Sequence, residues 1–101
     1  MGYSVVFTRA AQRDRDAVVE YLVRVLGNSG AAGRFLDELD AIIANLSVDP
    51  LMYEVVQEQR LRRQGYRKAL FMSYVAVFRA SGDVVYIVRI FHQKQDYARL
   101  L

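Results

Sequence analysis

The sequence predicts an α+β protein with the element order β-α-α-β-β-β, in which a helix hairpin packs on an antiparallel sheet of about four strands. Two amphipathic segments of helical periodicity occupy the first half of the chain, and three short segments rich in Val, Ile, Tyr and Phe follow in the second. A chain of 101 residues forms one domain around one core, so we expect a single domain over residues 1–101.

The N-terminal segment predicts a strand followed by a helix. Tyr3–Phe7 alternates as a short strand does, and Thr8 is a residue type that caps helix N-termini. From Arg9 to Leu26 the apolar residues recur at helical spacing, and Gly27 with Asn28 ends the pattern.

A second amphipathic segment gives the clearest helical pattern in the chain. It starts near Ser29 or Ala31 and ends before Pro50, because a residue that precedes proline is pushed out of the helical region. Its apolar stripe consists of Ala32, Phe35, Leu36, Leu39, Ile42, Ile43 and Leu46. Two such helices joined by a short turn should form an antiparallel hairpin.

The C-terminal half predicts an irregular segment and then three strands. Residues 51–64 have no clean period, so we expect a loop or a short irregular helix there. The strands are expected at Tyr66–Phe71, Tyr74–Ala80 and Val84–Phe91, joined by connections short enough for an antiparallel meander. The first strand would join this sheet, and the helix hairpin would cover one of its faces.

Composition excludes several classes of function. The chain has no cysteine and a single histidine, which excludes disulfides, thiol catalysis and a histidine-rich or thiolate metal site, and we expect no cofactor. Apolar runs are shorter than the ~20 residues that cross a bilayer, and the start of the chain lacks the pattern of a signal peptide. We therefore expect a cytoplasmic protein without a membrane partner.

Charge is distributed unevenly along the chain. Residues 1–50 carry five Arg against seven Asp or Glu, whereas residues 51–101 carry nine Lys or Arg against four acids. The densest basic segment is residues 60–68, with five basic residues in nine. This pattern favours a polyanionic partner that is contacted through phosphates. A solvated loop, or an acidic segment of a protein partner, would also account for it.

Strand alternation sorts the arginines of the expected sheet. In the last strand it predicts one side formed by Val85, Ile87, Arg89 and Phe91. Arg67, Arg79 and Arg89 would converge on one surface of the sheet if the strand registers agree.

Cleavage of RNA through a 2′-hydroxyl needs an acid, a base and positive charge near the scissile phosphate. His92 is the candidate acid or base, since histidine titrates near neutral pH, and Tyr97 is a candidate for stacking on a base. The alternative for His92 is a structural role, closing a strand through a backbone hydrogen bond.

Several segments resemble the RelE/ParE toxins of type II toxin–antitoxin systems, over nearly the whole chain. They are Phe7–Ala11 with Asp14 and Tyr21-Leu22, Gly65–Lys68, Tyr74–Arg79 and Val88–Tyr97. The resemblance implies a microbial-ribonuclease-like fold and a cognate antitoxin that wraps the toxin in a hetero-oligomer. Two activities occur in this family: RelE-like members cut mRNA in the ribosome without a metal and so arrest translation and growth, whereas ParE-like members poison DNA gyrase and are not nucleases.

The resemblance also assigns roles to residues, and on these we expect a ribosome-dependent mRNA endoribonuclease (an mRNA interferase). The expected catalytic residues are His92, Arg89, Arg67 and Tyr97. The expected RNA or phosphate contacts are Arg60, Arg62, Arg63, Lys68, Arg79 and Lys94. Tyr21 and Val25 are candidates for antitoxin binding.

Two positions depart from the RelE-like pattern and keep the alternatives open. Tyr74 stands where such nucleases usually have an arginine, and Gln93 stands where a tyrosine follows the catalytic histidine. The alternatives are a gyrase inhibitor without nuclease activity, in which the basic face and Ala98–Leu101 bind protein, and an inactive toxin fold that keeps antitoxin binding.

Overall fold

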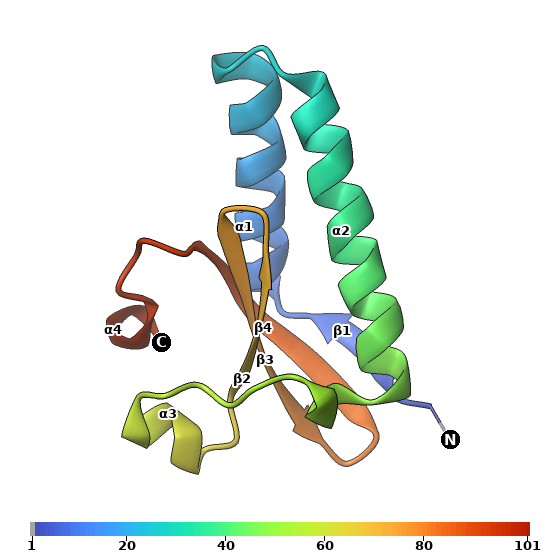
Figure 1. The fold of residues 1–101 in the computed structure, drawn as a ribbon, viewed down its shortest axis with the longest axis vertical. Helices are drawn as coiled ribbons and strands as arrows, with labels where there is room; N and C mark the ends of the chain where they lie inside the picture. The colour runs from blue at the N-terminus through green and yellow to red at the C-terminus, as the bar shows by residue number, and fades with distance from the viewer. Residues whose placement is uncertain (1) are drawn as a thin grey trace.

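The computed structural model describes residues 2–101, and its elements follow the predicted order (Figure 1). The strands are β1 (Ser4–Phe7), β2 (Arg67–Phe71), β3 (Tyr74–Ser81) and β4 (Val84–His92). The helices are α1 (Arg9–Glu20), a π-helical turn η1 (Tyr21–Val25), α2 (Ser29–Val48), a 3-10 turn η2 (Pro50–Met52), α3 (Gln59–Arg63) and α4 (Tyr97–Leu100). Residues 51–64, where a loop or a short irregular helix was expected, contain most of η2 and the whole of α3, and α4 is an addition.

The sheet is mixed, with the strand order β1-β4-β3-β2. β2, β3 and β4 form the predicted antiparallel meander. β1 pairs parallel to β4, from Ser4 opposite Val84 to Phe7 opposite Ile87, so the prediction of a wholly antiparallel sheet is wrong for this strand. Parallel pairing is possible here because the helix hairpin provides the long crossover that parallel neighbours need.

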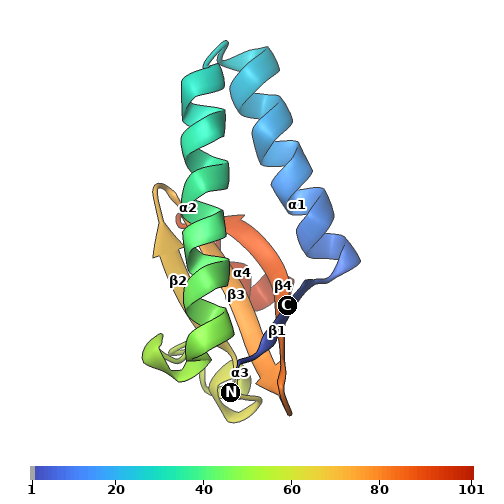
Figure 2. The same cartoon turned by 90° about the vertical axis from the view of Figure 1, so that its right-hand side faces the viewer.

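Side-chain caps fix the ends of the helix hairpin. The Thr8 hydroxyl accepts a hydrogen bond from the Ala11 amide (3.1 Å), and the Asn28 side chain accepts one from the Ala31 amide (2.9 Å). Between the helices, Gly27 adopts a φ of +60°, which glycine tolerates at no steric cost. The far end of the hairpin projects beyond the sheet in both views (Figures 1 and 2).

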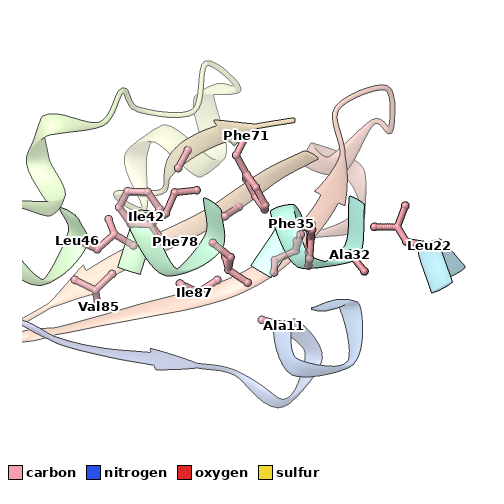
Figure 3. Packing of buried hydrophobic residues seen from close by; sticks show 14 of the residues in the cluster. Ala11, Leu22, Ala32, Phe35, Ile42, Leu46, Phe71, Phe78, Val85 and Ile87 are labelled. Atoms are coloured by element: carbon pink, nitrogen blue, oxygen red, sulfur yellow. The ribbon is translucent and has the colours of Figure 1, made fainter. Parts of the chain in front are cut away.

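The main core lies between the hairpin and one face of the sheet, which we call the hairpin face (Figure 3). Phe35, Leu39 and Leu46 of α2 are almost fully buried against Phe78 and Ile87 of the sheet. The centroids of the Phe35 and Phe71 rings lie 5.4 Å apart. The apolar stripe predicted for the second helix thus provides most of the buried side chains of the hairpin.

A second, smaller core covers the opposite face of the sheet, which we call the back face. Here Val75, Val77 and Phe91 of the sheet are buried under Leu61 of α3 and Val56. Tyr66 and the C-terminal residues Tyr97, Ala98 and Leu101 pack around this cluster. The short helices α3 and α4 lie on this side of the sheet, away from the hairpin (Figures 1 and 2).

A β-bulge in β4 overturns the predicted alternation of that strand. Val77 pairs with Arg89, but the next residue of β3, Phe78, pairs with Ile87, so Val88 is an extra residue in the ladder. Ile87 therefore faces the hairpin, whereas Arg89 and Phe91 face the back of the sheet. The predicted common side of Val85, Ile87, Arg89 and Phe91 does not exist, because one extra residue inverts every side chain beyond it.

Candidate functional site

The three sheet arginines do not form one cluster. Arg67 has the orientation of Ala69 and Phe71 on the hairpin face, and its Nη1 donates a hydrogen bond to the Tyr53 carbonyl oxygen (2.6 Å). Arg79 lies on the back face, with its guanidinium 5.4 Å from the centre of the Tyr66 ring. The expected convergence is thus wrong for Arg67, while Arg79 and Arg89 share the back face.

Arg89 is engaged in an ion pair that joins β4 to α1. Its Nε donates to Asp14 Oδ2 at 2.7 Å and its Nη2 donates to Asp14 Oδ1 at 3.1 Å. The hydrogen bond to Asp14 raises the pKa of Arg89 above its ordinary value, against the opposing effect of burial. The guanidinium also lies 4.6 Å from the centre of the Phe91 ring. Arg89 is therefore occupied on one side by a carboxylate and on another by an aromatic ring.

Asp14 of α1 is part of this site, although the sequence did not predict a role for it. Beyond Ile87 the outer edge of β4 has no β1 partner, and Asp14 Oδ2 accepts a hydrogen bond from the Ile90 amide there (2.9 Å). One carboxylate thus satisfies a strand edge and an arginine 75 residues away in sequence. No local pattern reports such a contact, although Asp14 belongs to the N-terminal segment that resembles the toxin family.

His92 ends β4 with an exposed side chain. Its amide donates to the Gln95 side-chain oxygen (2.8 Å), and its Nδ1 accepts a hydrogen bond from the Lys94 amide (3.2 Å). These contacts define a turn that holds the imidazole and the exposed Lys94 close together in the chain. The centroid of the His92 ring lies 5.8 Å from that of the Tyr74 ring, and the two rings meet edge to face.

Gln93 fastens this turn to the β2–β3 connection. Its Nε2 donates to the carbonyl oxygens of Met72 and Tyr74, each at 3.0 Å, and its amide donates to the Ser73 carbonyl oxygen at 2.8 Å. The sequence marked Gln93 only as a departure from the RelE-like pattern. Its amide side chain satisfies the backbone of a turn in which Met72 has a positive φ of 53°.

The two tyrosines near this turn are held in packing contacts. Burial raises the pKa of the Tyr74 hydroxyl, with a smaller effect from Tyr21, so Tyr74 stays protonated at neutral pH. The Tyr97 ring stacks on Phe91 with a centroid distance of 5.9 Å and an interplanar angle of 15°. The Tyr97 ring is thus part of the second core, whereas the sequence predicted that it would stack on a base.

The basic residues expected to contact phosphate lie in two environments. Arg60, Arg62 and Arg63 are exposed on α3, and Arg60 Nη2 donates to the Ala98 carbonyl oxygen of α4 (3.0 Å). Lys68, in contrast, is largely covered and lies 3.8 Å from Glu54, between Nζ and Oε1. Arg79 is exposed on the same side as α3 and α4.

Exposed apolar side chains gather at the far end of the hairpin. Tyr21 and Val25, the antitoxin candidates, are 49% and 67% exposed. A shallow groove of about 440 Å³ lies nearby between the two helices, lined by Arg15, Asp16, Val19, Glu20, Val23, Arg24 and Leu36. Neither candidate lines this groove, but both belong to the same exposed end.

Residues 2–101 contain no group of three or more His, Cys, Asp or Glu side chains that could hold a metal ion. Among these residues, no helix is both long and apolar enough to span a membrane.

The fold and these surfaces define a small basic α+β protein whose prominent features are an exposed hairpin end and an arginine-rich back face. The family model described as the ParE toxin of the type II toxin-antitoxin system, parDE, matches residues 5–97. The chain belongs to this family, and it is a toxin of the RelE/ParE superfamily. The resemblance inferred from the sequence is confirmed.

Two solved structures share the fold. A chain of the chromosomal ParDE toxin–antitoxin system from P. aeruginosa is 24% identical, with a TM-score of 0.70, over 89% of this chain and 95% of that one. A chain of the RelBE2 toxin–antitoxin complex from Mycobacterium tuberculosis is 22% identical, with a TM-score of 0.55, over 94% of this chain and 95% of that one. A search of curated protein sequences found no match.

Proposed function

We propose that this toxin inhibits DNA gyrase through surface contacts and has no nuclease activity. The observation that carries the proposal is the state of the arginines expected to clamp the scissile phosphate. Arg89 is paired with Asp14, and Arg67 lies on the opposite face of the sheet with a hydrogen bond to Tyr53. A nuclease of the expected design needs both guanidinium groups free beside His92. The match to a ParE family model supports the same proposal.

The ribosome-dependent endoribonuclease stays a prediction, and one observation favours it. His92 is exposed at the end of β4, and the exposed Lys94 follows two residues later in the same turn, so an acid or base and a basic residue share this turn. Arg67 and Arg89 would have to leave their partners for this activity. Tyr97 would have to leave its stack on Phe91.

We also propose that a cognate antitoxin covers the far end of the hairpin in a hetero-oligomer. Tyr21 and Val25 leave apolar surface in water there, beside the groove between the helices. Burial of this surface would stabilise a complex. Since gyrase, ribosomes and mRNA are cytoplasmic, the proposal places the toxin in the cytoplasm.

Two assays on the purified chain separate the activities. Gyrase is given relaxed plasmid with increasing toxin, and supercoiling is read on a gel. A cell-free translation reaction receives the same toxin, and primer extension looks for new 5′ ends in a reporter mRNA. The proposal expects lost supercoiling and intact mRNA. Normal supercoiling with ribosome-dependent cleavage would overturn it in favour of the nuclease.

The variant His92→Gln makes this comparison sharper. It keeps a polar side chain of similar reach but removes the group that transfers protons near neutral pH. We expect it to inhibit gyrase nearly as well as the wild type. Its matched control is Gln93→Ala, which keeps His92 and removes the side-chain contacts to Met72 and Tyr74. If His92→Gln abolished toxicity and Gln93→Ala retained it, proton transfer by His92 would be required.

A further inference from the structure

The back face of the molecule carries a group of exposed arginines around the second core. We call this group the basic face; it consists of Arg60, Arg62, Arg63, Arg79 and Arg99. α3 brings three of them together, α4 adds Arg99, and the hydrogen bond from Arg60 to Ala98 joins the two helices. We propose that the basic face binds double-stranded DNA through its phosphate backbone.

The charges of this face are poorly neutralised by the protein. Within residues 2–101, the salt bridges found involve other basic residues and none of these five. Glu58, the acid next to α3, offsets part of the Arg60 charge, and its two carboxylate oxygens accept hydrogen bonds from the amides of Arg60 (3.1 Å) and Leu61 (3.0 Å). Asp96 adjoins α4 as the other nearby acid. Grouped like charges repel one another, so a polyanion on this surface is favoured.

The aromatic residues of the back face favour a duplex over a single strand. Proteins that bind single-stranded nucleic acids present exposed aromatic rings on which bases stack. Here the Tyr66 ring lies under the Arg79 guanidinium, and the Tyr97 ring is stacked on Phe91 in the second core. Tyr86, which pairs with Arg79 across β3 and β4, is 39% exposed and adds one ring to this face. The surface thus offers five guanidinium groups and one exposed ring, which suits the regular phosphates of a duplex better than a row of stacked bases.

This inference deepens the proposed function, on which its biological meaning rests. Gyrase acts on a bound duplex, so a toxin with a DNA-binding face could contact the enzyme and its DNA together. The DNA contact would add to the affinity of the protein contact. Inhibition of gyrase does not require the DNA contact, however, so a failure of DNA binding can be told apart from a failure of gyrase inhibition.

The test measures binding of the 101-residue toxin, without gyrase, to a fluorescein-labelled DNA duplex of random sequence. Fluorescence anisotropy gives the dissociation constant at several salt concentrations. If all five arginines contact phosphates, the plot of log K against log salt should have a slope of about −4.5. A single-stranded DNA of the same length should bind more weakly.

Two double variants with the same change in charge give the control. Arg62→Glu with Arg63→Glu should weaken duplex binding at least tenfold at low salt and make the slope shallower by about two. Arg13→Glu with Arg34→Glu, at exposed positions of the hairpin helices, should change it much less. The milder pair Arg62→Gln with Arg63→Gln tests the same site if the glutamates disturb α3.

Equal losses in the two glutamate pairs would overturn the proposal, since the effect would then follow net charge alone. Absence of duplex binding at low salt would also overturn it. If the α3 variant inhibited gyrase poorly while the wild type bound no DNA, the basic face would be a protein contact. That result would leave the proposed function intact and refute the DNA inference.

Discussion

The two faces of the sheet are covered in different ways. On the hairpin face, α2 has 20 residues and buries six of its side chains, with Phe35 and Leu46 fully enclosed. On the back face, α3 and α4 have five and four residues, and Leu61 is the one buried side chain between them. Since stability follows buried apolar area, the hairpin face provides most of it. The back face provides less of the stability and carries the exposed arginines of the basic face.

The largest expected effect is on the hairpin face. Phe35→Ala should lower the free energy of unfolding by about 3–5 kcal/mol, because it removes a buried ring and leaves a cavity beside Phe71 and Tyr74. Leu61→Ala should cost roughly 2 kcal/mol, since the short α3 can settle into the space. Urea denaturation measures both. Equal losses would show that the two cores are equally important.

The ion pair between Asp14 and Arg89 should have the next largest effect on stability. Asp14→Ala removes the partner of Arg89 and leaves the Ile90 amide unsatisfied, so we expect a loss of about 1–3 kcal/mol in unfolding free energy. Asp14→Asn keeps an acceptor for Ile90 and should lose less. Identical losses in the two variants would mean that the charge accounts for the whole effect. Arg89 amide and side-chain NMR signals would report the freed guanidinium.

The helices on the two faces should also differ in the free energy of local opening. We expect amides of α3 and α4 to exchange with deuterium through openings of lower free energy than those of α2, because few apolar contacts hold the short helices. Hydrogen exchange followed by mass spectrometry measures this on the free toxin. Protection of α4 equal to that of α2 would contradict the comparison.

The smallest effect concerns the cap of α3. The hydrogen bond from the Leu61 amide lowers the pKa of Glu58, so this contact stabilises the fold above the ordinary glutamate pKa and is lost as pH falls through the lowered value. The urea midpoint of the wild type should therefore drop slightly more between about pH 6 and pH 3 than that of Glu58→Gln. A larger drop in the variant would reverse the sign and refute the assignment.

The sequence was sufficient to predict elements that depend on local patterns. The apolar stripe of α2, its end before Pro50 and the three late strands all follow from periodicity and turn residues. Parallel pairing of β1 was missed because four residues of strand carry no information about direction. The same segments could join either edge of the sheet in either sense.

The candidate site was harder to predict, for a physical reason. The arrangement of its arginines depends on one extra residue, Val88, whose bulge inverts the four residues of β4 that follow it. The ion pair of Asp14 and Arg89 joins residues 75 positions apart. Neither feature has a signature in a single sequence, whereas the basic segment at residues 60–68 did indicate the helix that carries the basic face.

The central claim is that this toxin acts on gyrase and not on mRNA. Its most direct test is supercoiling of relaxed plasmid by gyrase, with the wild-type toxin titrated in and toxin premixed with its antitoxin as the control. The account predicts that supercoiling falls with free toxin and is retained when the antitoxin is present. Full supercoiling at toxin in large excess over gyrase would contradict it.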